Sequence, residues 1–378
     1  MTLFVTILSS TTYGQLVPPQ LYSGMDGVHE LADGTLVPIW GYGWVADGEI
    51  TLPGPLLQYV EGEEVNLAFT NPSPESHTIH LHGLDVDQAN DGVPQTSFQV
   101  VTGESAEYNF TATHSGTYLY HCHVTTTLHL TMGMYGMILV TRPDNSLCEG
   151  GPVVSADYPL LFSDLEIATN MDPVQSFPFH DIRPDVFMVN GLSDQQLLTV
   201  DQTIWSSSSS PVALRLGSMA YSIVNCQFPA ELNAQLYMSD GRAIPSPIDI
   251  NSLEIFPGER FTVLLIPDEG YDGSFTVDFR HMLDGTIVSS QQILVRDEQY
   301  HPSAVSEISE PLTLYPNPVV NTLRIQGASQ IVVRNINGTV VFDGPLINGE
   351  LHVSSWPQGV YFVSSDIAVP VTKFVVLH

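Results

Sequence analysis

Short segments in which apolar positions alternate with polar ones follow each other along the chain, with turns between them. Val65–Thr70 alternates in this way, and Gly116–Tyr120 combines aromatic and β-branched residues behind a glycine. Gly133–Val140 is a further apolar run of strand length. Asp-Gly pairs at 33–34 and 47–48 are typical of the turns that join such strands. Because few segments carry the apolar repeat of an amphipathic helix, the pattern predicts an all-β protein.

Breaks in this pattern divide the 378 residues into several segments. The apolar start over residues 1–15 is typical of a secretion signal peptide, so we expect an exported protein. Residues 16–146 and 150–298 are each long enough for a β domain. The polar, proline-containing stretch 299–311 is expected to be a linker. Residues 312–378 are predicted to form a small β unit of their own.

The charge balance is strongly acidic, with 41 Asp and Glu against 10 Lys and Arg and a formal net charge of −31. A chain of this charge repels polyanions, which excludes nucleic acid and an anionic membrane surface as partners. The acidic surface serves solubility in any habitat and is equally typical of a protein from a saline one.

Seven of the 13 histidines lie between residues 77 and 129. His121 and His123 directly follow the predicted strand that ends at Tyr120, and Cys122 stands between them. Because successive side chains of a strand point to opposite faces, the two histidines share one face and Cys122 lies on the other.

The same alternation applies to the upstream segment, where His80 and His82 share one face and His77 lies on the opposite one. Pairing of the two segments therefore predicts two separate sets of metal ligands. The first, called here the cysteine set, consists of His77, Cys122, His129 and Met134. The second, called here the histidine set, consists of His80, His82, His121 and His123.

The chemistry of both sets indicates copper. Two histidines, a cysteine and a weak methionine are the ligands of a blue-copper electron-transfer site, whereas an all-imidazole set suits a copper site that binds a small molecule. The tripeptide His121-Cys122-His123 joins the two sets, so an electron at Cys122 is a few bonds from either histidine. A single buried cysteine is usually a structural residue, but the clustering of so many ligand types favours metal binding.

The segments that carry these ligands, residues 77–83 and 121–123, resemble the two copper motifs of the multicopper oxidase family, which includes the laccases. The resemblance implies that the cysteine set holds type 1 copper. It also implies that the histidine set belongs to the type 2/type 3 copper cluster at which oxygen is reduced. One spacing departs from the family, because His129 follows Cys122 by seven residues instead of the usual five.

The resemblance implies a secreted copper-dependent oxidoreductase with His121, Cys122 and His123 at the centre of its catalysis. A small-molecule or metal-ion reductant gives single electrons to type 1 copper, and O2 is reduced at the histidine-bound centre. The resemblance further implies cupredoxin-like Greek-key β-barrels or sandwiches at 16–146 and 150–298, the second without a copper motif.

Three other functions stay open. A two-domain copper nitrite reductase shares the type 1 layout, but that family has Asp in place of His80 and no histidine in place of His123. A surface electron carrier needs the cysteine set alone and leaves the histidine set unexplained. A copper-sequestering protein has no use for Cys122 between two histidines.

The histidine set is half of a complete cluster, because the family uses eight histidines, four from each of two domains. Residues 150–298 contain only His180 and His281. We therefore expect a homo-oligomer. In one arrangement two chains form a dimer that shares one cluster on its axis. In the other, a cyclic assembly, His281 of the partner subunit completes a single type 2 copper site.

Residues 312–378 resemble the C-terminal sorting domain of the type IX secretion system. The likeness covers the whole tail and includes the segments 314–318, 359–363 and 372–376. It implies recognition by the type IX secretion machinery, passage through the outer membrane and a secreted or cell-surface location.

Two cysteines, Cys148 and Cys226, remain once Cys122 is assigned to copper. In an exported protein two such cysteines predict a disulfide, here between the segment that joins the two β domains and the second of those domains. Two free buried thiols are the alternative.

Overall fold

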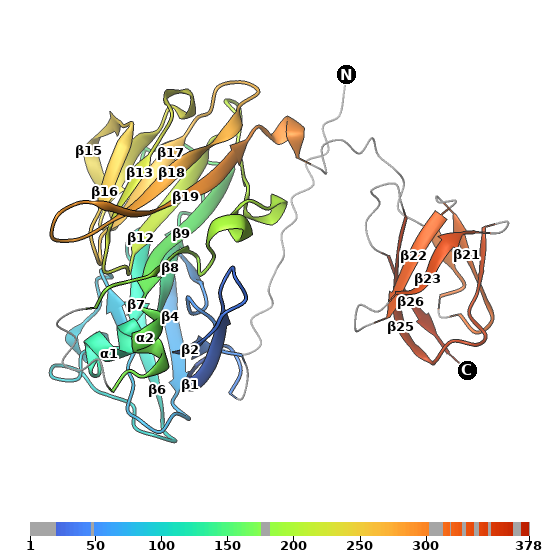
Figure 1. Ribbon diagram of the computed structural model, residues 1–378, viewed down its shortest axis with the longest axis horizontal. Coiled ribbons are helices and arrows are strands. Elements are labelled where there is room, and N and C mark those ends of the chain that lie inside the picture. The colour runs from blue at the N-terminus through green and yellow to red at the C-terminus, as the bar shows by residue number, and fades with distance from the viewer. Residues whose placement is uncertain are drawn as a thin grey trace. The chain divides into compact units, whose positions relative to one another are not determined.

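The computed structural model divides into two compact units, with the boundary between Asp297 and Glu298 (Figure 1). It describes residues 20–46, 49–174, 182–301, 313–317, 319–326, 330–335, 340–346, 349–365 and 372–377. The signal peptide predicted at 1–15 and most of the linker predicted at 299–311 lie outside these residues. Strands dominate the described residues, so the prediction of an all-β protein is confirmed.

The first part of the larger unit, residues 20–146, is a sandwich of two four-stranded sheets. One sheet has the order β2 (Leu36–Gly43), β1 (Gln20–Glu30), β4 (Glu64–Thr70) and β6 (Ser105–Thr111). The other has the order β3 (Leu57–Val60), β8 (Tyr135–Thr141), β7 (Gly116–His121) and β5 (His80–His82). Alternate residues of β4 are buried, and Leu67 and Phe69 share one core with Tyr108 and Tyr120. The period-two pattern of the sequence thus places one face of each sheet inward.

The second part, residues 150–297, has the same two-layer build with larger sheets. Its six-stranded sheet has the order β10 (Val186–Val189), β9 (Ala156–Leu165), β12 (Val212–Ser218), β17 (Arg260–Leu265), β14 (Gln235–Ser239) and β15 (Arg242–Asp249). Its five-stranded sheet has the order β11 (Ile204–Trp205), β19 (Ile287–Arg296), β18 (Asp272–Arg280), β13 (Ile223–Gln227) and β16 (Ser252–Ile255). The two sheets enclose an aromatic and aliphatic core that includes Phe162, Phe275 and Phe279.

Strand β7 is buried along its whole length because the second part packs against it. Its even-numbered residues, such as Tyr118 and Tyr120, belong to the core of the first part. On the opposite face, Leu119 packs with Leu161 of the second part. The face of β7 that bears His121 is therefore the face that looks towards the second part.

The smaller unit, from Glu298 onward, is also built from strands. One sheet has the order β20 (Thr313–Tyr315), β21 (Thr322–Gln326) and β24 (Glu350–His352). The other has the order β23 (Val340–Pro345), β22 (Gln330–Asn335), β25 (Gly359–Ser365) and β26 (Thr372–Val376). Leu323, Val333, Tyr361 and Phe374 belong to a core that is separate from those of the larger unit.

Helices in the described residues are few and short. The α-helices are α1 (Thr126–Thr131) and α2 (Ile167–Met171). The 3-10 helices are η1 (Gln88–Asn90), η2 (Asp194–Leu197), η3 (Val200–Gln202), η4 (Ala230–Leu232) and η5 (Glu298–Tyr300). None of the helices in the described part of the chain has the length and apolar character needed to cross a membrane.

Cys148 and Cys226 are both free thiols, so the disulfide predicted between them is wrong. Cys226 lies in β13, where Leu253 and Val277 are its cross-strand partners, and it is fully buried in the core of the second part. Cys148 lies outside that core, in the connection that follows β8, and is partly exposed. A count of cysteines cannot distinguish a bridging thiol from one that packs as a small apolar side chain.

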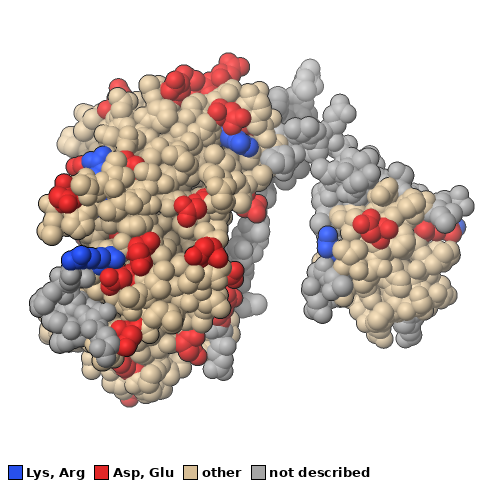
Figure 2. All heavy atoms as spheres, in the orientation of Figure 1, with Lys and Arg blue, Asp and Glu red and all other residues tan. Residues whose placement is uncertain are grey.

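The acidic composition is visible at the surface, where carboxylates are scattered over the face drawn in Figure 2 with few basic groups among them. Two arginines of the second part are buried and paired instead. Arg215 donates to Asp157 at 2.6 Å, and Arg260 donates to Asp240 at 2.8 Å. In both pairs the guanidinium group is buried and its carboxylate partner is more exposed.

Candidate metal centres

The cysteine set comes together at the end of β7. Cys122 follows the last residue of this strand, and its Sγ lies 3.1 Å from His129 Nδ1 and 3.7 Å from His77 Nδ1. All three side chains are buried, and their ligand atoms lie within 4.8 Å of one another. Met134 is buried in the same core cluster as Cys122.

Backbone hydrogen bonds fix these residues relative to one another. The Cys122 amide donates to Met134 O at 3.0 Å, and the Met134 amide donates to His129 O at 2.9 Å. His77 is anchored independently by a β-bridge to Val100, with hydrogen bonds of 3.0 and 2.9 Å. The thiol and both imidazoles are therefore held by three different segments of backbone.

Helix α1 accounts for the unusual spacing between Cys122 and His129. The chain enters this helix through Thr125, whose φ of 41° lies in the left-handed region. His129 lies on the buried side of the helix. The longer connection is thus folded into a helical turn that returns His129 to Cys122.

Glu75 contacts the outer nitrogen of His129. The Glu75 Oε2 lies 3.3 Å from His129 Nε2, and the side chain of Glu75 is 50% exposed whereas that of His129 is 0% exposed. A carboxylate accepts the Nε2 proton and so leaves the Nδ1 lone pair directed at Cys122. By contrast, His77 Nε2 is buried and has no hydrogen-bond partner among the described residues.

Burial keeps the cysteine set neutral in the absence of metal. It lowers the pKa of His77 to about 3, with the neighbouring His129 as the second cause. It also lowers the pKa of His129, although the hydrogen bond to Glu75 opposes this effect. Burial raises the pKa of the Cys122 thiol. A cation that binds here therefore meets two neutral imidazoles and displaces one proton from sulfur.

The histidine set is assembled by the pairing of β5 with β7. His80 lies directly opposite His121 in this antiparallel pair, and His82 Nδ1 lies 3.3 Å from His121 Nε2. The ligand atoms of these three histidines lie within 4.8 Å of one another. His123 lies outside the trio, with its ring centroid 5.2 Å from that of His80 and 5.9 Å from that of His121.

Neighbouring polar groups orient two members of the histidine set. Asp91 contacts His80 Nδ1 through its carbonyl oxygen at 2.8 Å and its carboxylate at 3.3 Å. The His123 amide donates to Thr78 Oγ1 at 2.9 Å, and the Tyr42 hydroxyl donates to Thr78 O at 2.6 Å. Thr78 thus ties His123 to the segment that also carries His77.

The imidazoles of the histidine set that are most enclosed are also neutral. Burial lowers the pKa of His121 to about 3. Burial and then the positive charge of Arg260 lower the pKa of His82 to about 4. At neutral pH both rings therefore offer lone pairs to a metal.

A cavity of about 950 Å³ lies between the two parts of the larger unit. His82 and His121 line it from the first part, and His281 lines it from the second. Asp164 lines it as well and accepts hydrogen bonds from the amides of Tyr221 and Ser222 at 2.8 and 2.9 Å. Burial raises the pKa of the Asp164 carboxyl to about 6, so this group gains and loses a proton near neutral pH.

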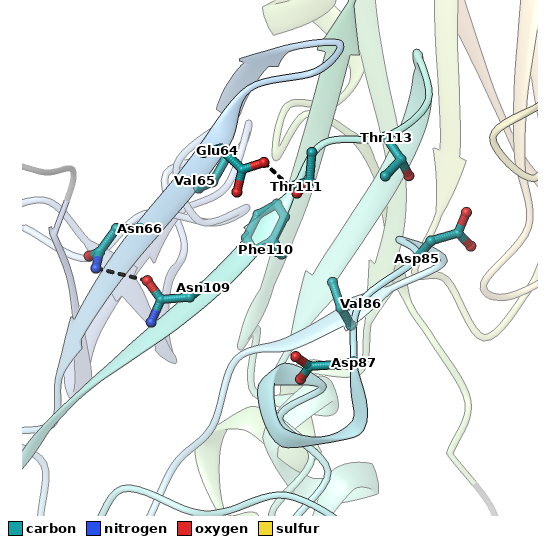
Figure 3. A pocket seen from close by; sticks show the side chains of 10 residues that line it. All are labelled: Glu64, Val65, Asn66, Asp85, Val86, Asp87, Asn109, Phe110, Thr111 and Thr113. Carbon is teal, nitrogen blue, oxygen red and sulfur yellow. Dashed lines mark hydrogen bonds between the residues drawn. The ribbon is translucent and has the colours of Figure 1, made fainter.

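A second cavity, of about 440 Å³, lies on β4 and β6, and its lining does not include the metal-ligand candidates (Figure 3). Glu64, Asp85 and Asp87 supply its carboxylates. Glu64 accepts a hydrogen bond from Thr111, and Asp85 is paired with Arg242 and with His114. Its acids are thus engaged with neighbouring side chains, and we assign it no role.

Known protein families match two segments of the chain. Residues 41–145 match the family model of multicopper oxidases. Residues 313–376 match the model of the secretion system C-terminal sorting domain. The chain carries a multicopper oxidase domain. Both resemblances inferred from the sequence are thereby confirmed, and the metal of this family is copper.

Individual relatives agree with this family. Copper resistance protein A of Escherichia coli is 37% identical over 90 residues, which are 24% of this chain and 14% of that protein. The structure of a blue copper oxidase from Nitrosomonas europaea has 26% identity and a TM-score of 0.61, covering 75% of this chain and 87% of that one. The multicopper oxidase domain thus has the expected cupredoxin-like fold, although the chain spans only 14% of the length of copper resistance protein A.

A copper nitrite reductase from Nitrosomonas europaea shares the fold as well. Its TM-score is 0.58 at 21% identity, and the match covers 74% of this chain and 93% of that one. Likeness at this level concerns the fold alone, so the ligand residues decide between the two kinds of enzyme.

All eight predicted ligands lie around the end of β7, in two groups. Their roles as copper ligands stay predictions. His281 lines the cavity beside the histidine set, whereas His180 lies outside the described residues. Glu75 and Asp164 were not predicted, because an acidic residue in so acidic a sequence carries no distinguishing signal. The position of Glu75 two residues before His77 is the only hint that the sequence offers.

Proposed function

We propose that this protein is a copper-dependent oxidoreductase that takes single electrons from a reductant at the cysteine set and reduces O2 at the histidine set. The observation that carries the proposal is the presence of two adjacent ligand groups of different chemistry, joined through the tripeptide at residues 121–123. The multicopper oxidase domain of residues 41–145 supports it.

The donor atoms of the cysteine set fit a type 1 copper ion. Two Nδ1 atoms and one sulfur converge in a buried site, and Met134 is tied by backbone hydrogen bonds to Cys122 and His129. Copper supplies one-electron redox chemistry when it is bound at both sets. The side chain of His129 is 0% exposed, so a reductant in solution approaches this site through Glu75 rather than through the imidazole itself.

The residues around the histidine set fit a site that consumes protons. Reduction of O2 to two waters takes up four electrons and four protons. The cavity of about 950 Å³ gives a small molecule access to His82 and His121. Asp164 lines that cavity, and its pKa of about 6 suits a group that donates a proton near neutral pH.

Nitrite reduction is the second candidate, favoured by the shared fold of the Nitrosomonas europaea nitrite reductase. His80 and His123 count against it, because that family has neither histidine. His80 belongs to the converging trio, and its ring contacts that of His123. A set of four clustered imidazoles supports oxygen as the acceptor.

The test is an assay of the copper-loaded protein against O2 and against nitrite, with copper counted per chain. We expect O2 uptake in the presence of a reductant, no nitrite reduction and more than one copper per chain. A variant with His80→Ala and His82→Ala should keep the blue colour of the cysteine set and lose O2 uptake. Nitrite turnover without O2 uptake would overturn the proposal.

The tail supports export by the type IX secretion machinery and a secreted or cell-surface location for the enzyme, since residues 313–376 match a secretion sorting domain. Cell fractionation with an antibody against the larger unit tests this. Retention of the full-length protein in the cytoplasm would contradict it.

We also propose that the enzyme is a homo-oligomer, because the histidine set has half of the ligands of a complete cluster. Mass measurement in solution, combined with His281→Ala, separates the two arrangements. A dimer that shares one cluster keeps its activity in this variant, and a cyclic assembly capped by His281 loses it. A monomer that reduces O2 on its own would contradict both.

A further inference from the structure

Gly83, which ends the His80-Leu81-His82-Gly83 segment, lies against a side chain of the second part. Its φ is +88°, in the left-handed region that favours glycine. A Cβ at this position would lie only 2.9 Å from Arg260 Cζ. The absence of a side chain therefore allows the guanidinium group to rest on the backbone directly after His82.

Arg260 is buried and hydrogen-bonded in this position. It is the first residue of β17, is 6% exposed, and donates from Nη1 to Asp240 Oδ1 at 2.8 Å and to Gly258 O at 2.9 Å. Its Nε is buried and has no hydrogen-bond partner among the described residues. The same turn brings Gly258 so close that a Cβ there would lie 3.2 Å from His82 Cε1. The second part thus approaches the segment of the histidine set at two points, with Arg260 against Gly83 and Gly258 beside His82.

We propose that Arg260 is a positioning residue for the histidine set, and that through it the second part, which has no copper motif, takes part in the chemistry. The guanidinium fixes the end of β5 by packing on Gly83. It also places a permanent positive charge beside His82. This inference rests on the proposed function, because it assigns Arg260 to the site at which O2 is reduced.

The expected consequence follows from electrostatics. A fixed positive charge favours the lower charge state of a nearby metal, so Arg260 raises the reduction potential of copper held by the histidine set. Asp240 opposes this effect, because its carboxylate partly offsets the guanidinium charge. The burial of Arg260 limits screening by salt and keeps the effect local.

Opposite shifts in two variants provide the test. Arg260→Gln removes the positive charge, and we expect it to lower the midpoint potential of the histidine-set copper in a redox titration followed by electron paramagnetic resonance. Asp240→Asn removes the opposing charge and is expected to raise it. Arg260→Lys, which keeps the charge, should restore most of the wild-type potential. Arg296→Gln is the matched control, since Arg296 pairs with Asp272 at the surface and should leave the potential unchanged.

If Arg260 had a merely structural role, Arg260→Gln and Asp240→Asn would both lose copper and unfold at a lower temperature. That result would overturn the inference. The copper-free protein gives an independent readout. With histidine labelled at Cε1, the nuclear magnetic resonance signal of His82 should shift in Arg260→Gln and not in Arg296→Gln. An unmoved His82 signal in Arg260→Gln refutes the positioning role. If that signal does shift but the wild-type protein binds no copper, the proposed function alone is refuted.

Discussion

His129 is held by three contacts that together determine which of its nitrogens can bind a metal. Cys122 Sγ lies 3.1 Å from Nδ1, and Glu75 Oε2 lies 3.3 Å from Nε2. Trp40 packs edge-on against the ring, at a centroid distance of 5.5 Å. Because the carboxylate accepts the Nε2 proton, the imidazole is oriented for binding through Nδ1 before any metal arrives.

The contact between Glu75 and His129 predicts a tuning role for this carboxylate. Glu75→Gln keeps a hydrogen-bond acceptor but removes the charge, so we expect the protein to stay blue with a raised potential at the cysteine set. Glu75→Leu also removes the acceptor and should weaken copper binding roughly 10–100-fold. Redox titration at the blue absorption band measures the first effect. Glu104→Gln, at an exposed position, is the control, and an equal shift in both glutamine variants would contradict the prediction.

Cys122 is expected to be the source of the blue colour. In Cys122→Ser the sulfur-to-copper charge transfer is lost, so the visible band should disappear while copper at the histidine set remains. Met134→Leu should keep the band and raise the potential, because the weak axial ligand tunes it. Absorption spectra and copper counts per chain check both variants. A Cys122→Ser protein that stays blue would show that the cysteine set is not a type 1 site.

Burial of His77 predicts an acid-dependent stability of the copper-free protein. The folded-state pKa of His77 is about 3, below the ordinary value of 6.5, so between these values the unfolded chain binds a proton that the folded chain does not. The stability contributed by the neutral ring is therefore full above pH 6.5 and is lost as the pH falls towards 3. As the pH falls from 7 to 4, the free energy of unfolding of His77→Leu should rise by roughly 3 kcal/mol relative to that of the wild type.

Denaturant unfolding of both copper-free proteins at several pH values measures this difference. The comparison cancels the contributions of the many carboxylates, which are the same in both chains. A difference that is independent of pH would mean that His77 titrates normally in the folded state.

At the scale of the elements, strand alternation alone separates the two ligand sets. Tyr118 and Tyr120 face the core of the first part, so Cys122 on the same side reaches His77, whose segment also directs Ile79 inward. The four members of the histidine set face the other way. His121 ends β7 and His123 follows it at the next odd position, whereas His80 and His82 occupy the even positions of β5. Because this parity is a local property of strands, it could be predicted without knowledge of the fold.

Long-range contacts could not be predicted in this way. The turn of α1 that returns His129 to Cys122 depends on packing, since the segment Thr126–Thr131 is too short to indicate a helix. The contact between Arg260 and Gly83 joins residues far apart in the sequence, and only the packing of the second part on β7 creates it. The predicted disulfide failed for the same reason, because the core position of Cys226 is a property of β13 and its neighbours.

The free thiols predict a clear difference in reactivity. Cys148 is partly exposed and should be alkylated in the folded, copper-loaded protein, whereas Cys226 is fully buried, with a pKa that burial raises, and should react only after unfolding. Intact-mass measurement should give the same mass with and without reductant. An unreduced protein that is two mass units lighter than the reduced one would show that the disulfide does form. Cys226→Ser should cost roughly 1–3 kcal/mol, because it buries a hydroxyl in an apolar core.

At the scale of the whole molecule, the ligand candidates and the charged residues beside them come from different parts of the chain. All eight ligand candidates lie in the first part, whereas the second part supplies Arg260 beside His82 and Asp164 in the shared cavity. The burial of β7 on both faces makes this division possible, since the strand carries one ligand set on the side of its own core and the other on the side of the second part. Loss of the second part should therefore impair the histidine set more than the cysteine set.

The smaller unit has its own hydrophobic core, which predicts that it can be removed without loss of the enzyme. A chain that ends after Asp297 keeps both ligand sets, Arg260 and the cavity, so we expect it to bind the same amount of copper per chain and to retain the activity of the full-length protein. Its unfolding temperature should also be unchanged, because the two units have separate cores. Export is expected to fail, since the segment that matches a secretion sorting domain is gone, and the truncated enzyme should accumulate in the periplasm. Copper analysis, calorimetry and cell fractionation of both chains check these outcomes, with a frame-preserving deletion of residues 303–310 as the control that keeps the sorting domain. A truncated chain that loses copper or unfolds at a lower temperature would show that the tail is part of the enzyme.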